Sequence, residues 1–355
     1  MTRDQRGGDI DFGRRLWVVR VLDRVDGRID IRTVGVCAAL LLVTVVVSVV
    51  AVGTGDFYIP PNEVLAAVFG DGPRLTEIVV MEWRFPRVAL AFLFGAALGV
   101  SGAVFQSLTR NPLGSPDIIG FGTGAYTGAL VVILALGGGY YRTGAGALVG
   151  GLATAAVVYL LAYRRGVQGF RLIIVGIAVS AVLASVNTWL VIRADLDDAI
   201  AAAVWGAGTL NGLGWSQVGP VLVVSVVIAS CLAVLSRRLP MLEMGDDAAR
   251  ALGVRAEPTR LMLVFLGVAL IAMVTAAAGP ISFIALAAPQ LARRLTGTSS
   301  VAMVPAACMG ALLLVVSDVV AQRVFAPTQL PVGVVTVSVG GAYFVWLLAR
   351  EGRKQ

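Results

Sequence analysis

The 355-residue sequence contains no histidine, a single lysine and three cysteines. Without histidine, and with Cys37, Cys231 and Cys308 far apart inside apolar runs, the chain offers no pattern for a zinc, haem or Cys/His nucleophilic site. We interpret the three cysteines as small buried hydrophobes. The phosphate-binding loop of ATPases needs a lysine inside a glycine-rich motif, whereas Lys354 lies at the C-terminus. The chain therefore does not hydrolyse ATP by that route.

Charged residues are also scarce. They make up 14% of the chain, while 58% of residues are hydrophobic and the mean hydropathy is +0.87. Soluble domains average about 25% charged and about 45–50% apolar residues. The 42 glycines include pairs spaced four apart at 95/99, 124/128 and 146/150, a spacing that favours tight contact between membrane helices. The composition excludes a soluble enzyme and predicts an all-α protein that crosses the bilayer several times.

Apolar runs long enough to cross a bilayer recur along the chain. A hydrocarbon core about 30 Å thick requires about 20 apolar helical residues. Nine runs could meet this requirement: 33–52, 88–105, 118–137, 144–163, 172–192, 216–236, 261–278, 301–317 and 331–349. A tenth candidate begins at Ile281 but reaches Arg293 after twelve residues, so it is a short span or a re-entrant segment. Short helices outside the membrane are expected at 60–70 and 199–210.

The positions of the basic residues favour ten spans over nine. With ten spans and a cytoplasmic N-terminus, 22 of the 28 basic residues lie on the cytoplasmic side. Cytoplasmic loops of membrane proteins carry such an excess. Nine spans would place the basic C-terminus outside. The sequence thus predicts ten transmembrane helices with both termini cytoplasmic.

The predicted organisation has three parts. Residues 1–32 form a polar, Arg-rich cytoplasmic tail that lacks the apolar core of a signal peptide. Residues 33–350 form the ten-helix membrane domain, which includes a cytoplasmic loop at 237–260. Residues 351–355 form a second, short cytoplasmic tail.

Candidate functional residues lie near the outer ends of two spans. Arg84 and Arg87 flank a Phe-Pro pair where the second span starts, so both could project from one first turn. They are either snorkelling arginines at the headgroup level or a cationic patch for carboxylates of an external partner. Asp318 lies near the outer end of the ninth span, where an acid is costly and often functional. An ion pair or helix cap near Arg323 is the structural alternative.

On the inner side, a proline-rich turn follows the second span. Pro112 and Pro116 end the helix, and Asn111 and Asp117 suit helix ends because their side chains bond free backbone groups. The segment predicts a tight turn that returns the chain to the bilayer.

The cytoplasmic loop 241–260 predicts a short amphipathic helix outside the membrane. Asp246 and Asp247 suit its N-terminus and Gly253 its C-terminus. One face of that helix is apolar; it consists of Met244, Ala248, Ala251 and Leu252. The face either lies on the lipid surface or docks into a soluble cytoplasmic partner.

The motifs, taken in order, resemble the permease subunits of ABC importers for iron–siderophores, haem and cobalamin, the FecCD type. The likeness runs from about Thr33 to Leu348. The blocks that carry it are 84–87 with 95–103, Gln106 with 109–113, Leu252-Gly253, 279–283 and 330–336. Three glutamines depart from the usual pattern: Gln290, Gln322 and Gln329 stand where the family usually has His, Arg and Glu.

The resemblance implies a permease that works as a pair, with a second copy or a paralogue, in the cytoplasmic membrane of a prokaryote. Spans two to five and seven to ten would be inverted repeats. ATP and Mg²⁺ would bind to separate cytoplasmic ATPase subunits, so this chain would be no enzyme and would bind no cofactor, metal or nucleic acid. An extracytoplasmic siderophore-binding protein would deliver a ferric siderophore.

The resemblance also assigns residues to these contacts. The residues expected to couple to the ATPase are Met244, Asp246, Asp247, Ala248, Arg250, Ala251, Leu252 and Gly253. Those expected to contact the binding protein are Arg84, Arg87 and Arg323. The polar candidates along a path between spans five and ten are Ser180, Ser185, Asn187, Thr336 and Ser338.

Three alternatives stay open. An ion- or proton-driven secondary transporter would need paired intramembrane acids or bases, and only Asp318 is available. A permease for haem or cobalamin would share the same motifs. A membrane scaffold without transport would differ only in its partners.

Overall fold

A computed structural model of the chain describes residues 16–20, 26–55, 58–117, 120–163, 169–298 and 300–352. The first of these form an antiparallel hairpin of β1 (Leu16–Arg20) and β2 (Asp26–Asp30), with Leu16 opposite Asp30. The sequence predicted only a polar tail over these residues. The Trp-Val-Val run in β1 carries the aromatic and β-branched residues that favour strands.

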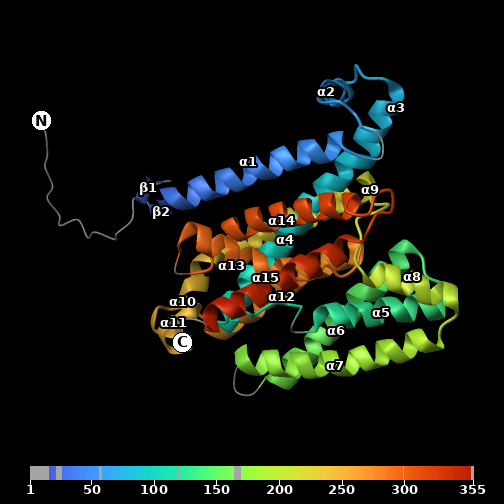
Figure 1. Cartoon of the computed structure of the whole chain (residues 1–355). Coiled ribbons are helices and arrows are strands. Elements are labelled where there is room, and N and C mark those ends of the chain that lie inside the picture. The colour runs from blue at the N-terminus through green and yellow to red at the C-terminus, as the bar shows by residue number, and fades with distance from the viewer. Residues whose placement is uncertain are drawn as a thin grey trace, which may run out of the picture.

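All remaining elements are helices (Figure 1). They are α1 (Ile31–Gly53), α2 (Pro61–Phe69), α3 (Arg74–Glu77), the π-helix η1 (Ile78–Arg84), α4 (Phe85–Thr109), α5 (Phe121–Leu136), α6 (Tyr140–Ala162), α7 (Gly169–Arg193), α8 (Leu196–Gly206), α9 (Trp215–Leu235), η2 (Ser236–Arg238), α10 (Leu239–Glu243), α11 (Asp246–Ala251), α12 (Ala256–Ala278), α13 (Ile284–Thr296), α14 (Met303–Arg323) and α15 (Val332–Gly352). Each apolar run predicted to span a membrane coincides with a helix, and α2 and α8 match the two expected outer helices.

Seven of the described helical segments are long and apolar enough to cross a membrane, and α5 and part of α15 are shorter apolar helices. The candidate that begins at Ile281 becomes α13, which has 13 residues. A polytopic helical protein is therefore confirmed, while ten spans with cytoplasmic termini stay a prediction. In Figure 1 the hairpin, α10, α11 and the end of α15 gather at one end of the bundle, and α2, α3 and α8 lie at the other.

The second span begins earlier than the sequence predicted. α3, η1 and α4 form one helical segment from Arg74 to Thr109, so Arg84 and Arg87 lie within it rather than in its first turn. Pro86 cannot donate the usual helical hydrogen bond. The wider turns of η1 precede it, and Phe85 donates to Val80 five residues back.

Glycine faces determine how the helices pack. Gly95 and Gly99 of α4 lie against Gly310 and Ala306 of α14, and a Cβ atom at Gly99 would overlap the Ala306 carbonyl. The same kind of contact joins α5 to α6 through Gly124, Gly128, Gly146 and Gly150. In a membrane such contacts matter because lipid is as apolar as leucine, so close backbone approach and dispersion drive helix association. The predicted role of these glycine pairs is confirmed.

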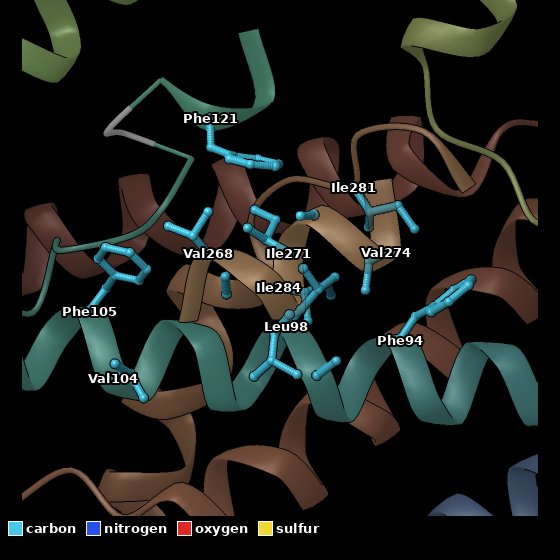
Figure 2. Close-up of a cluster of buried hydrophobic side chains, with 14 of the residues drawn as sticks. Phe94, Leu98, Val104, Phe105, Phe121, Val268, Ile271, Val274, Ile281 and Ile284 are labelled. Carbon is cyan, nitrogen blue, oxygen red and sulfur yellow. The ribbon is translucent and has the colours of Figure 1, made fainter. Parts of the chain in front are cut away.

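The core lies where α4, α5, α12 and α13 meet (Figure 2). Phe121 at the start of α5 and Ile284 at the start of α13 converge with Leu98 of α4 on the buried side chains around Ile271 of α12. Both short helices therefore begin in the interior of the bundle, close to the middle of α12. Parts of the irregular segments that precede them are buried there: residues 114–116 and Gly120 before α5, and Gly279 and Ile281 before α13.

The helices also repeat in length. α4 to α7 have 25, 16, 23 and 25 residues, and α12 to α15 have 23, 13, 21 and 21. In each set the second helix is short and follows a proline-containing irregular segment. This common order supports the internal repeat expected from the sequence.

Candidate functional site

A buried ion pair joins α4 to α14. Arg87 donates from Nη2 to Asp318 Oδ1 at 2.8 Å and from Nε to Asp318 Oδ2 at 2.9 Å. The side chains are only 14% and 3% exposed. Gln322 Nε2 donates to the same carboxylate at 2.8 Å, and Arg87 Nη1 donates to Gln329 Oε1 at 3.1 Å. We call these four residues the outer network.

The outer network corrects two expectations. The partner of Asp318 is Arg87, from a distant part of the chain, and not the nearby Arg323, which is exposed. Arg84 turns away from Arg87 and donates from Nη1 to the Val52 carbonyl at 2.7 Å, at the end of α1. Helix ends present free carbonyls that a guanidinium can satisfy. Both arginines thus serve the fold, and contact with a binding protein stays a prediction for Arg84, Arg87 and Arg323.

These arginines still border open space. A cavity of about 570 Å³ lies at this end of the bundle and is lined by Arg84, Arg87, Glu82 and the two network glutamines. Gln322 and Gln329 were noted in the sequence as departures from the resembled family. The structure gives them a shared role, because both complete the hydrogen bonds of the Arg87–Asp318 pair.

A second charge network lies at the opposite end of α4. Arg260 of α12 donates from Nη2 and Nη1 to the two carboxylate oxygens of Asp246, at 2.5 and 3.2 Å. Arg110, just after α4, lies 3.5 Å from the same carboxylate. The hydrogen bond from Arg260, with the charges of Arg260, Arg110 and Arg250, lowers the pKa of Asp246 below its ordinary value. We call Asp246, Arg260 and Arg110 the inner network.

The inner network fixes the cytoplasmic loop. The short helix predicted here is α11, which begins at Asp246 directly after Gly245, whose φ is +115°. Met244, which the sequence assigned to the apolar face of this helix, lies before it at the end of α10. Gly253, with a φ of +80°, follows α11 as expected. The loop is also attached to α4 by a hydrogen bond from the Ser107 hydroxyl to Glu243.

The apolar face of this loop is largely uncovered. Met244 is 69% and Leu252 57% exposed, and Ala251 is exposed beside them. Ala248 is half-buried, while Ala249, which the sequence did not single out, is fully buried against the bundle. Asp247 and Arg250 are exposed and lie 3.8 Å apart at the surface. The residues predicted to couple to the ATPase thus form an exposed ridge, and the coupling itself stays a prediction.

The turn after α4 is the one predicted, with details that the sequence did not give. Asn111 Oδ1 accepts the backbone N–H of Leu113 at 2.9 Å, which closes the turn locally. Gln290, the third glutamine that departs from the family pattern, donates from Nε2 to Gln106 Oε1 at 2.5 Å and links α13 to α4. No sequence signal pointed to this pair, because their positions are 184 residues apart.

The five predicted path residues differ in burial and in hydrogen bonding, and their role in a path stays a prediction. Ser185 and Ser338 are exposed and donate to carbonyls of their own helices, at 3.0 and 2.8 Å. Thr336 is buried and donates to Gly333 at 3.0 Å. Ser180 and Asn187 each keep a buried side-chain oxygen without a hydrogen-bond partner. Of the five, Asn187 lines a polar cavity of about 530 Å³ beside α5.

Among the described residues, no group of three His, Cys, Asp or Glu side chains could hold a metal ion. Comparison with known proteins decides what kind of site this architecture serves. Residues 40–350 match the profile of the FecCD transport family. The chain belongs to that family.

The proteins similar to this chain align with three quarters or more of it. It is 50% identical to the ferric enterobactin transport system permease protein FepG of Escherichia coli, over 90% of this chain and 97% of that protein. It is 34% identical to the hemin transport system permease protein HmuU of Yersinia pestis, over 76% and 82%. A solved inward-facing structure of a metal-chelate type ABC transporter aligns with a TM-score of 0.79 and 26% identity, over 89% and 99%. The chain is thus a multi-pass transport permease of the ABC type and not an enzyme.

Proposed function

We propose that this permease carries a ferric siderophore across the cytoplasmic membrane of a prokaryote, as one of two paired permease subunits. A binding protein outside delivers the chelate, and ATP and Mg²⁺ act on separate cytoplasmic subunits. The observation that carries this proposal is the 50% identity to a ferric enterobactin permease over 97% of that protein's length.

The inner loop supports the ATP-driven part of the proposal. Met244 and Leu252 present apolar surface on a loop that is held rigidly by Asp246 and its two arginines. Exposed apolar ridges rimmed by charged residues are typical of protein contacts. An ATPase bound to this ridge would move α4 and α12 directly, because Asp246 of the loop contacts Arg110 after α4 and Arg260 of α12.

The alternative of an ion- or proton-driven secondary transporter depended on Asp318 as its intramembrane acid. Asp318 is fully engaged by Arg87 and Gln322, so its charge is neutralised within the fold. Haem remains a second candidate cargo, because the hemin permease HmuU is a relative at 34% identity.

The test is uptake of radiolabelled ferric siderophore by cells that lack the gene and carry either the wild-type or a variant copy. Leu252→Glu should reduce uptake at least about tenfold, because a charge replaces the apolar contact, while the matched Leu252→Met should transport normally. Uptake should stop with vanadate, an inhibitor of such ATPases, and persist with a protonophore when ATP is maintained. Uptake that continues unchanged in the presence of vanadate would refute the ATP-driven mechanism. Uptake of haem but not of siderophore would show that haem is the cargo.

A further inference from the structure

A partly polar cavity that opens on the surface of the subunit has no assigned role. It measures about 530 Å³ and lies between the start of α5, the C-terminal half of α7 and the segment that precedes α13. Its polar side chains come from all three places: Asp117, Thr123, Tyr126, Asn187, Thr188 and Ser282. The described residues that line it include one carboxylate and neither arginine nor lysine.

Asn187 presents an unused acceptor to this cavity. Its side chain is 4% exposed, and Nδ2 donates to the Thr123 carbonyl at 3.4 Å. Its Oδ1 has no hydrogen-bond partner. A buried carbonyl left unpaired costs about 1–3 kcal/mol. Such a group is therefore poised to accept a hydrogen bond from a ligand that enters the cavity.

Asp117 supplies the negative charge of the cavity. Its carboxylate accepts the Ser115 hydroxyl at 3.2 Å and the backbone N–H of Phe283. Phe283 is the N-cap of α13, and Gly120, three residues after Asp117, is the N-cap of α5. Helix N-termini carry partial positive charge and attract anions, including the anionic groups of substrates in transporters. Here a side chain of the protein already occupies that place.

An aromatic ring lines the same cavity. Tyr126 lines the cavity and stacks on Trp205 of α8, with ring centroids 6.4 Å apart and planes 6° from parallel. Gly206 lies beneath the Tyr126 ring, and a Cβ atom there would crowd it. The ring is thus fixed in position. A fixed aromatic face beside a carboxylate attracts cations.

We propose that this cavity binds a cationic, hydrogen-bond-donating group of the cargo, such as an ammonium or an amide N–H, and disfavours anionic groups. Asn187 Oδ1 accepts the hydrogen bond, Asp117 supplies the charge and Tyr126 the aromatic face. The inference rests on the proposed function, because it assumes that a chelate passes this point. It adds to that function a rule for discriminating between chelates.

The charge preference can be measured without cargo. In a variant that lacks the three native cysteines, Thr188→Cys places a thiol in the cavity, and Ser185→Cys places one on the same helix outside it. At each position, the rate of a cationic methanethiosulfonate is divided by that of an anionic one. This rate ratio should be about three- to tenfold higher at position 188 than at position 185. Adding Asp117→Asn should lower the cation-to-anion rate ratio at position 188 to the value found at position 185. Equal ratios at the two positions, or a ratio that Asp117→Asn leaves unchanged, would overturn the inference.

A second experiment measures the same charge preference by transport. Three forms of one ferric trihydroxamate, differing only in a terminal ammonium, acetamide or succinamate group, are compared for uptake. The wild-type permease should show the lowest KM for the ammonium form, and Asp117→Asn and Asn187→Leu should each reduce that preference at least about threefold. Equal KM values in the wild type would refute the inference while leaving the proposed function intact. Absence of uptake of any ferric chelate, with the thiol preference present, would refute the function and leave the cavity's charge preference standing.

Discussion

The two ends of α4 carry the same chemistry in different surroundings. At each end an arginine pairs with an aspartate from another element. The outer pair, Arg87–Asp318, is 2.8 Å long with side chains 14% and 3% exposed. At the inner end, Asp246, with a side chain 35% exposed, contacts two arginines: Arg110 at 3.5 Å, which is 46% exposed, and Arg260 at 2.5 Å, which is 10% exposed. Burial removes water as a competing partner, so breaking the outer pair is costly, whereas exposed pairs contribute little.

The difference indicates how a transport cycle could use this helix. The outer network holds α4 to α14, and separating Arg87 from Asp318 would leave the buried Asp318 carboxylate without its counter-charge. The inner network holds the loop of α10 and α11 to α12 through the largely buried Arg260, and to α4 through Arg110, whose exposed contact with Asp246 water can replace. Motion driven from the cytoplasm is therefore expected to rearrange the inner end while the outer end stays closed.

The largest effect is expected from Asp318→Ala. It leaves Arg87 buried without its counter-charge, which should lower the free energy of unfolding by about 3–5 kcal/mol. Unfolding of the purified protein by SDS titration in mixed micelles measures this. Replacing both partners, Arg87→Met with Asp318→Leu, should recover most of the loss. A single variant as stable as the wild type would show that the pair is dispensable.

A smaller effect in the outer network is expected from Gln322→Leu. It removes one hydrogen bond to the Asp318 carboxylate and keeps the ion pair, so the loss should be about 1–2 kcal/mol by the same titration. Gln322→Glu serves as the sharper comparison, since it places a like charge beside Asp318 and should destabilise more. The reverse order would contradict the contact.

At the inner end, Asp246→Asn should lower stability by about 1 kcal/mol, because Asn keeps one acceptor for Arg260 and water reaches Asp246, whose side chain is 35% exposed. The effect depends on pH. The folded-state pKa of Asp246 lies below its unfolded value of about 3.9, so its contribution is present above that pH and is lost as the pH falls through the folded-state pKa. Wild type and variant should therefore differ at pH 7 and converge below about pH 4. A difference that persists in acid would argue against the charge network.

The smallest effect is expected one residue further on. Asp247→Asn removes the same charge from α11, but its side chain is fully exposed and its partner Arg250 lies 3.8 Å away at the surface. Stability should not change measurably. This variant is the matched control for Asp246→Asn, and a comparable loss at both positions would mean that α11 responds to charge in general and not to the inner network.

The sequence predicted the helices well, because their signal is local. Apolar runs, prolines and glycines marked the long helices to within a few residues, except that the second apolar segment begins at Arg74 and not near residue 88. Small-residue spacing marked the faces through which α4 and α5 pack. Where the prediction failed, local signals were misleading. Pro86 looked like a helix start, yet the π-helical turns before it allow the helix to continue. Met244 was assigned to the apolar face of α11, yet Gly245 begins that helix and leaves Met244 before it.

The contacts of the charged residues could not be predicted in the same way. Arg87 and Asp318 are 231 positions apart, and Gln106 and Gln290 are 184 apart. Proximity in the chain favoured Arg323 as the partner of Asp318, because an isolated sequence contains no measure of distance through space. The resemblance to the family predicted a path role for Asn187, but none for Asp117, which lines the same cavity.

The sequence alone determined that this protein is helical, crosses a membrane and belongs among transport permeases, because composition, helical periodicity and short motifs are properties of neighbouring residues. Only the tertiary structure decided which arginine neutralises Asp318, which side of the inner loop remains exposed, and that Asp117 and Asn187 border one cavity. Those outcomes depend on how α4, α5, α7, α12 and α13 pack. Packing sums many weak contacts between distant segments, and no single stretch of sequence encodes it.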